Sequence, residues 1–213
     1  MSKVLITRPE FDYPTRYISA WAKKIVELVN KKGNALDLPR EKSNRKLVES
    51  MLKKHNPSLV FFNGHGGKDC VMGQDNEVLV KAGQNEAMLT DKIVYSLSCG
   101  SAAILGPASV NSGARAYIGY KRDFALMYDE NKRTRCHEDK LAELFLGPSN
   151  QVMVSLLKGH TVQEAHISAK NSFKKNIRKL LTSTTSPHSV CVPYLLWDLQ
   201  AFIDVGDSAA KYN

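Results

Sequence analysis

Two residues in the middle of the chain are of types that carry out nucleophilic chemistry together. His65 follows the apolar run 58–62, and Cys99 follows the apolar run 93–97, 34 residues later. A cysteine thiolate is a strong nucleophile even when only partly ionised, and a nearby imidazole raises the ionised fraction or takes the thiol proton. The pair therefore predicts thiolate attack on an acyl carbon, provided that the fold brings both side chains into one cleft.

Glycines next to His65 favour the same chemistry. Gly64 and Gly66 flank the histidine, and the absence of a Cβ atom permits unusual backbone angles there. The Gly66 N–H can then point into the cleft beside the Cys99 N–H, where two donors would form an oxyanion hole for a tetrahedral intermediate. Cys99 also precedes a small-residue segment, 102–113, whose helical N-terminus would favour a thiolate. The competing interpretation is structural, because a cysteine that ends a buried strand is most often a small hydrophobic residue.

The elements that must position these residues follow from the apolar periodicity. Strands are expected at 3–7, 35–38, 58–62, 93–97, 115–119 and 202–205. Helices are expected at 17–29, 44–55 with Ser43 as N-cap, 102–113, 138–145, 152–158 and 162–181. A small hairpin is expected within 68–85, and a polar loop at 182–189. Apolar strands separated by helices predict an α/β fold, a three-layer sandwich with a mostly parallel central sheet flanked by helices.

The carboxyl ends of the strands are where such a sheet binds its ligands. If the strands 58–62 and 93–97 are neighbours, their ends lie about 5 Å apart. His65 and Cys99 would then project into the same cleft.

The composition is that of a globular protein with an ordinary core. With 213 residues, 43% hydrophobic and 24% charged, the chain needs no disulfide or metal to fold, and we expect one domain spanning 1–213. No apolar run approaches the roughly 18–20 residues of a membrane span, and the apolar stretch near the N-terminus is too short for a signal peptide. The four cysteines show no CxxC spacing, so we expect a reduced, cytoplasmic protein without a membrane partner.

The formal net charge of +9 raises the question of a nucleic-acid partner. The basic excess lies in helical-looking stretches such as 44–55 and 161–181, whereas residues 61–120 carry four Lys/Arg against five Asp/Glu. The excess is read either as solvated helix faces or as a patch that tracks phosphates. Because the motif-bearing segment is close to neutral, nucleic acid is not expected as the main ligand.

Three blocks stand in a restrictive order: FNGHG at 62–66, LSCG at 97–100 and GARAYIG at 113–119. An ending with Pro193-Tyr194, Trp197, Phe202 and Val205-Gly206-Asp207 follows them. In this order the blocks resemble the caspase-like (clan CD) cysteine peptidases, and most closely the gingipain-type and CHAT domains. The resemblance covers about residues 55–207.

This resemblance implies a caspase-like fold and a cysteine endopeptidase that needs no cofactor or metal. At the matching positions it assigns His65 as general base and acid, Cys99 as nucleophile, and the N–H groups of Gly66 and Cys99 as oxyanion donors. The implied partners are a protein or peptide substrate and, in addition, a regulatory protein. Tyr194 and Trp197 are expected to fill core between the final segment and the sheet.

Substrate specificity is not implied by the resemblance, because the residues around the nucleophile differ. Leu97-Ser98 stands where caspases carry Gln-Ala, and Cys99-Gly100 stands where CHAT domains often carry Cys-Glu. Charged residues near the strand ends support either choice of the residue before the scissile bond, P1: Arg8 and Arg122 would bind an acidic one, and Asp69, Asp75 and Asp123 a basic one. Gingipain-like members commonly cleave after Lys or Arg, which favours the basic choice.

Two further features leave alternatives open. The basic loop 130–136 lies where related peptidases are often cut, so self-processing near 132–135 is one hypothesis and an uncut loop the other. A zinc site from His65, Cys70, Cys136 and His137 matches no zinc spacing, and no metal is expected. The alternative function is an idle caspase-like module that binds a protein or nucleic acid through the basic helix at 161–181.

Overall fold

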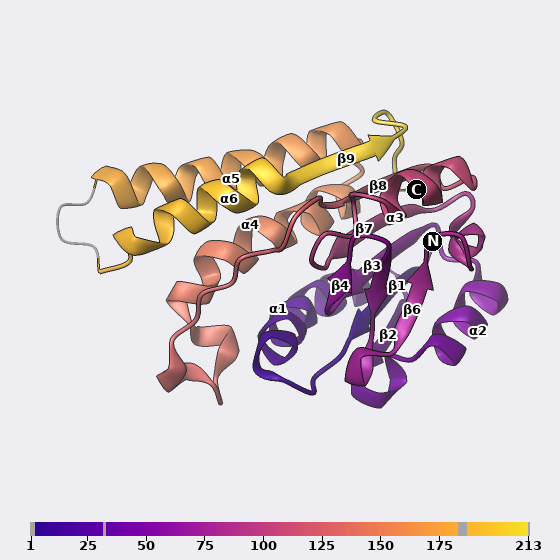
Figure 1. Ribbon diagram of the computed structural model, residues 1–213, viewed down its shortest axis with the longest axis horizontal. Coiled ribbons are helices and arrows are strands. Elements are labelled where there is room, and N and C mark those ends of the chain that lie inside the picture. Colours follow the sequence, from indigo (N-terminus) through magenta and orange to yellow (C-terminus); the bar gives the residue numbers. More distant parts are fainter. Residues whose placement is uncertain (1–2, 32, 183–186, 213) are drawn as a thin grey trace.

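The computed structural model describes residues 3–31, 33–182 and 187–212. At its centre is a six-stranded sheet in the order β2-β1-β3-β7-β8-β9 (Figure 1). Its strands are β1 (Val4–Arg8), β2 (Ala35–Pro39), β3 (Leu59–Asn63), β7 (Ile93–Leu97), β8 (Ala116–Tyr120) and β9 (Phe202–Gly206). Neighbouring strands are parallel except β8 and β9, which are antiparallel. The expected α/β fold with a mostly parallel sheet is therefore confirmed.

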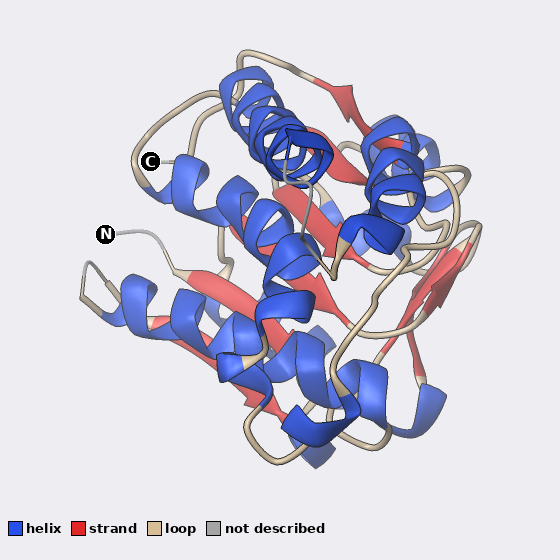
Figure 2. Ribbon diagram, turned by 90° about the vertical axis from the view of Figure 1, so that its left-hand side faces the viewer, coloured by secondary structure: helices blue, strands red, loops and turns tan. Residues whose placement is uncertain are grey.

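Helices cover both faces of this sheet (Figure 2). One face packs against α1 (Tyr13–Asn30), α4 (Lys140–Leu157) and α5 (Val162–Thr182), and the other against α2 (Arg45–His55) and α3 (Leu105–Asn111). Successive strand residues alternate between the two cores: Phe61 and Tyr95 face the first, Val60 and Val94 the second. Burial on both faces explains why these strands are near-continuous apolar runs.

A second, antiparallel sheet follows β3 directly. It consists of β4 (Gly66–Gly67), β5 (Cys70–Met72) and β6 (Val78–Lys81), in that order. The hairpin expected within 68–85 is the β5–β6 part of this sheet. Val71, Leu79 and Val80 are buried in the core shared with α2 and α3, and this packing fixes the chain that begins at His65. Short 3₁₀ turns occupy Arg40–Lys42, Gln74–Asn76, Glu86–Leu89, Glu130–Lys132, Cys136–Glu138 and Ser189–Cys191.

Two helices begin at other residues than expected. α1 begins at Tyr13 because the Asp12 side chain accepts a hydrogen bond from the Thr15 N–H, in a reciprocal capping arrangement. The N-cap of α2 is Asn44 rather than Ser43, since the Asn44 side chain accepts from the Leu47 N–H at 2.9 Å.

α4 is a single helix where the sequence predicts separate helices at 138–145 and 152–158. It continues through Gly147-Pro148, although Pro148 has no N–H to donate to the carbonyl of Leu144. The Asn176 side chain on α5 donates to that carbonyl instead, at 2.9 Å. A neighbouring helix thus satisfies the group that proline leaves unpaired.

α6 (Val192–Ala201) is absent from the predicted elements. It lies beside α5, beyond the edge of the sheet (Figure 1), and buries Leu195 in a cluster with Phe173 of α5. The expectation that Tyr194 and Trp197 fill the core is wrong: they are 47% and 41% exposed. Pro193 is tolerated because it occupies the first turn of the helix, where an N–H has no intrahelical partner.

Two expectations remain, one about a loop and one about membrane-spanning helices. The polar loop expected at 182–189 includes residues 183–186, which lie outside the described residues. Within the described ranges, none of the helices has the length and apolar character needed to cross a membrane.

Candidate functional site

The strands that lead to His65 and Cys99 are neighbours, which is the condition that the sequence analysis set for a shared cleft. β3 and β7 pair in parallel, with Asn63 opposite Leu97 in the register. His65 and Cys99 each follow two residues after this pair, so both leave the sheet at the same level of its carboxyl edge. Ligands of open α/β sheets bind at this edge.

The backbone of Gly66 lies directly against the segment that carries Cys99. A Cβ atom on Gly66 would stand 2.8 Å from the Ser98 Cβ and 3.0 Å from the Cys99 carbonyl oxygen. Real Cβ atoms do not approach so closely, so this contact requires glycine. The histidine segment and the cysteine segment therefore meet through Gly66.

The Gly66 N–H is not used by the small sheet. The Met72 N–H donates to the carbonyl of His65 at 2.9 Å, and hydrogen-bonded and non-bonded pairs alternate along an antiparallel ladder. Gly66 and Val71, the next pair in the register, therefore exchange no hydrogen bonds. The Gly66 N–H therefore turns away from β5. An oxyanion donor must be unused in this way, and the role of Gly66 as such a donor stays a prediction.

His65 is held by a carboxylate that the sequence analysis missed. The Asp12 Oδ2 atom lies 2.5 Å from the His65 Nε2 atom, and the ring of Phe11 meets the imidazole edge-on at 5.7 Å between centroids. Burial raises the pKa of Asp12, but hydrogen bonds from Thr15 and His65 outweigh it and lower that pKa below its ordinary value. A carboxylate on one ring nitrogen fixes the tautomer of the imidazole and leaves the other nitrogen for chemistry.

A local pattern could have revealed Asp12. An acidic residue four positions after the end of a strand, three before Thr15 and two before Pro14, is a helix N-cap pattern. The cap places the carboxylate at the start of α1, and thus at the carboxyl edge of β1, the strand next to β3.

The Cys99 thiol is partly buried and accepts a hydrogen bond from the Phe124 N–H, with 3.4 Å between nitrogen and sulfur. Burial raises its pKa above the ordinary value despite that hydrogen bond, and the nearby carboxyl groups of Asp123 and Asp198 raise it further. Burial therefore favours the neutral thiol of Cys99 over its thiolate. Ionisation requires a partner that takes the proton, as the imidazole of His65 would.

The sequence analysis predicts that the N-terminus of a helix at 102–113 favours a thiolate at Cys99, but α3 does not begin there. α3 begins at Leu105, because the preceding residues bond to the chain after β8 instead of continuing the helix backwards. The Gly100 N–H donates to the carbonyl of Arg122 at 3.0 Å, and the Ala102 N–H donates to that of Tyr120 at 3.1 Å. These bonds secure the cysteine segment to the end of β8.

Two of the predicted specificity residues lie beside this segment. The guanidinium of Arg122 stacks on the Trp197 ring at 4.2 Å, and the Trp197 indole N–H donates to the carbonyl of Asp123 at 2.7 Å. A surface hollow of about 510 Å³ lies here, with a mostly apolar lining: Asp123, Phe124, Ala125, Pro193, Tyr194 and Trp197.

Two of the other three predicted specificity residues, Arg8 and Asp69, have partners elsewhere. Arg8 is buried and donates to both carboxylate oxygens of Asp37 at 2.8 Å each, which commits its guanidinium to an internal ion pair. The exposed carboxylate of Asp69 lies 3.5 Å from the Lys81 ammonium group. The structure therefore brings Arg122 and Asp123, but not the Arg8 guanidinium, to the wall beside Cys99.

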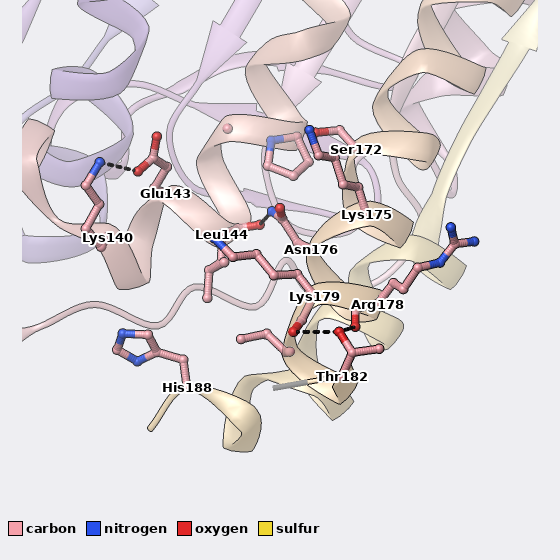
Figure 3. Close-up of a pocket in the computed structure, with 13 residues that line it drawn as sticks. Lys140, Glu143, Leu144, Ser172, Lys175, Asn176, Arg178, Lys179, Thr182 and His188 are labelled. Carbon is pink, nitrogen blue, oxygen red and sulfur yellow. Dashed lines mark hydrogen bonds and ion pairs between the residues drawn. The ribbon is translucent and has the colours of Figure 1, made fainter. Parts of the chain in front are cut away.

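A separate groove of about 850 Å³ lies between α4 and α5 (Figure 3). Basic residues of α5, Lys175, Arg178 and Lys179, are exposed along it. These residues form the basic face that the sequence analysis predicts for this helix. The groove and the hollow beside Cys99 have no lining residue in common. Among the described residues, no group of three or more His, Cys, Asp or Glu side chains is arranged to hold a metal ion.

Comparison with known proteins gives no family assignment. Neither a scan against protein-family models nor a search of curated proteins found a match to this chain. The fold defines the class: an α/β protein with a mostly parallel six-stranded sheet, flanking helices and a small antiparallel sheet.

Proposed function

We propose that the chain is a cysteine endopeptidase with Cys99 as nucleophile and His65 as general base and acid. The observation that carries this proposal is the contact of the Gly66 backbone with the Ser98–Cys99 segment, at the edge where His65 is held by Asp12. A nucleophile, a base with an orienting carboxylate and a turned-out N–H are the parts that acyl transfer needs.

The mechanism begins with transfer of the Cys99 thiol proton to His65. The thiolate then attacks the carbonyl carbon of the scissile peptide, and the oxygen that becomes negative accepts hydrogen bonds from the N–H groups of Gly66 and Cys99. Collapse of this intermediate breaks the C–N bond, and His65 gives its proton to the leaving amine. Water, deprotonated by His65, then hydrolyses the thioester and restores the thiol.

Digestion of a mixed peptide library tests the proposal. New peptide termini produced by the wild type and absent with Cys99→Ala, read by mass spectrometry, are the expected result. His65→Ala should slow cleavage by on the order of 10²–10⁴-fold. His55→Ala is a matched control, because His55 lies at the end of α2 and bonds Lys3. Cleavage that persists in Cys99→Ala would show that the cysteine is not the nucleophile.

Thiol labelling gives a second readout that does not require a substrate. Burial raises the pKa of Cys99, so rapid alkylation at mildly acidic pH requires that His65 takes the proton. We expect iodoacetamide to label Cys99 first and His65→Ala to abolish this preference. Cys70, Cys136 and Cys191 are buried thiols that serve as internal controls. Uniformly slow labelling in the wild type would instead favour an idle module that binds a partner.

A further inference from the structure

The groove between α4 and α5 has a basic rim. Its described lining holds one carboxylate, that of Glu143, and four exposed cationic side chains, those of Lys140, Lys175, Arg178 and Lys179. Figure 3 shows Lys140 and Glu143 on one side of the groove and the basic residues of α5 on the other. Lys140 pairs with Glu143 at 2.8 Å, but no carboxylate of the described residues pairs with the three cations of α5. The groove therefore presents positive charge that is free for a partner.

The floor of the groove is apolar. Pro148 of α4 and Leu180 of α5 line it and are buried, and Leu144 and Gly147 of α4 lie beside them, half-buried. The volume of about 850 Å³ is large enough for several side chains of a ligand. A ligand that fits both parts needs apolar groups for the floor and negative charge for the rim.

Gly147 keeps this floor open at a cost to the helix. Glycine inside a helix is destabilising relative to alanine, and Pro148 next to it removes a hydrogen bond. A Cβ atom on Gly147 would meet only the Glu143 side chain, at an ordinary 3.9 Å, so packing within the described chain does not require glycine there. Proteins break such local rules mainly at functional sites. The pair therefore points to a ligand that uses the space above it.

The walls of the groove favour a helical ligand. Both walls are helices, whose backbone groups bond within the helix. The Leu144 carbonyl, which Pro148 leaves unpaired, already accepts from Asn176 at 2.9 Å. An extended peptide would bury backbone groups here without a row of partners. A helix brings its own backbone hydrogen bonds and inserts apolar side chains three and four residues apart.

We infer that the groove binds an acidic amphipathic helix of a partner protein. Leucine-like side chains of this helix fill the floor, and carboxylates beside them pair with the basic rim. Single-stranded nucleic acid fits the groove less well, because it binds by stacking bases on aromatic rings and no Phe, Tyr or Trp occurs in the described lining. The inference does not depend on the proposed peptidase activity.

Fluorescence anisotropy with a series of fluorescein-labelled peptides tests the inference. The peptides have about 15 residues, close to the shortest length that forms a helix in water. They carry leucine at every third or fourth position and glutamate between, and the leucine pattern varies along the series. The full-length Cys99→Ala chain is used, so that cleavage cannot consume the probe. We expect a subset to bind in a salt-dependent way, and to lose binding when glutamine replaces glutamate or serine replaces leucine.

Variants of the rim and of the floor locate the binding site. Lys175→Gln with Lys179→Gln should weaken binding by on the order of 10-fold. Lys53→Gln with Lys54→Gln is the matched control, because it removes the same charge from exposed positions of α2, on the other face of the sheet. It should leave the affinity unchanged. Gly147→Leu fills the floor without a change of charge and should weaken binding by a similar factor, whereas Gly147→Ala should weaken it less.

Several outcomes would overturn the inference. Equal losses in the two lysine pairs would show general charge attraction, and an unchanged affinity in Gly147→Leu would exclude the floor. Tighter binding of an oligothymidylate through Lys175 and Lys179 would assign the groove to nucleic acid. A series in which no peptide binds would also refute the inference. If Gly147→Leu fails to fold, the serine-for-leucine peptides still decide, because binding without leucine contradicts an apolar floor.

Discussion

Gly66 is the residue on which the geometry of the candidate site depends most directly. Its backbone fills the space between the histidine segment and the Ser98–Cys99 segment, and no other residue fits there without movement of one of the two. The requirement is one of space, because a Cβ atom on Gly66 would meet backbone and side-chain atoms from two strand ends.

We predict that Gly66→Ala separates the two halves of the site. The added methyl group would collide with Ser98 and Cys99, and overpacking of this kind costs about 1–3 kcal/mol of unfolding free energy. Cys99 labelling should lose its dependence on His65. Urea unfolding and alkylation rates check both effects.

Gly147→Ala is the matched control for this change. Gly147 lies inside α4, and a Cβ atom there would meet only the Glu143 side chain at an ordinary 3.9 Å. Alanine should therefore stabilise the chain by about 0.5–1 kcal/mol and leave labelling unchanged. A Gly66→Ala variant that labels like Gly147→Ala would contradict the proposed site.

The buried carboxyl group of Asp198 should make the free energy of unfolding depend on pH. Its ordinary pKa is 3.8, and burial raises it to about 8 in the folded chain. Between these values the folded chain holds a proton that the unfolded chain has lost, so the unfolding free energy falls as pH rises and levels off above about pH 8. Asp198→Asn should remove this contribution. Urea unfolding of both chains at about pH 5 and about pH 9 measures it; an Asp198→Asn advantage that does not grow with pH would refute the assignment.

At the scale of elements, α4 and α5 behave as one unit. Pro148 interrupts the hydrogen bonding of α4, and Asn176 of α5 restores it by donating to the Leu144 carbonyl, as Figure 3 shows. The contact joins the two helices at the groove between them.

We predict that Asn176→Ala lowers the unfolding free energy by about 1 kcal/mol, because the Leu144 carbonyl then lacks a partner. Asn171→Ala, an exposed change on the same helix, should have almost no effect. In a double-mutant cycle, Pro148→Ala supplies an N–H and should reduce the effect of Asn176→Ala. Additive effects in urea unfolding would show that the two residues are not coupled.

Within the loop between β8 and α4, the segment 129–136 is anchored to α1 at both of its ends. The Tyr17 hydroxyl donates to the carbonyl of Asp129 at 3.0 Å, and the Trp21 indole donates to that of Cys136 at 2.9 Å. The basic residues between these anchors include Arg135, whose side chain is 60% exposed.

We predict that wild-type protein cuts itself between the two anchors, after a basic residue of 132–135. Both pieces should stay together under native conditions, because α1 holds each of them. Intact mass after denaturation, beside native size-exclusion chromatography, measures this. The matched control is Cys99→Ala, which should stay in one piece. A single full-length mass for both chains would exclude self-processing.

At the scale of the whole molecule, the basic groove along α5 and the hollow beside Cys99 share no lining residue. The net charge is +9. The basic residues that line the groove on α5 are none of the residues that line the hollow beside Cys99. A charged face and a reactive edge can therefore be tested independently.

We predict that the variant Lys175→Gln with Lys179→Gln keeps wild-type peptide cleavage and Cys99 labelling. If the basic helix binds nucleic acid, the same variant should reduce the salt dependence of binding by about two phosphate contacts. Fluorescence anisotropy with single-stranded DNA across salt concentrations measures the latter. Loss of peptide cleavage in this variant would connect the groove with the site.

Much of the site's framework could be predicted from local patterns. Apolar runs before His65 and Cys99 predict buried parallel strands. That these two strands are neighbours, with Asn63 opposite Leu97, was decided by the fold. Asp12 and Asp198 were missed for different reasons. Asp12 is recognisable only as a helix cap. Asp198 lies on α6, where Pro193 and the absence of a clear apolar stripe conceal the helix.

The sequence by itself determined the α/β class, the strands and the two chemical residue types, because alternation and apolar runs are local properties. Only the tertiary structure decided which carboxyl groups lie near His65 and Cys99. The N-cap of α1 meets His65 from across the sheet edge, and α6 packs beside α5 so that Asp198 lies under the chain after β8. Such contacts join residues far apart in the chain, and their burial and distances arise only when the elements pack together.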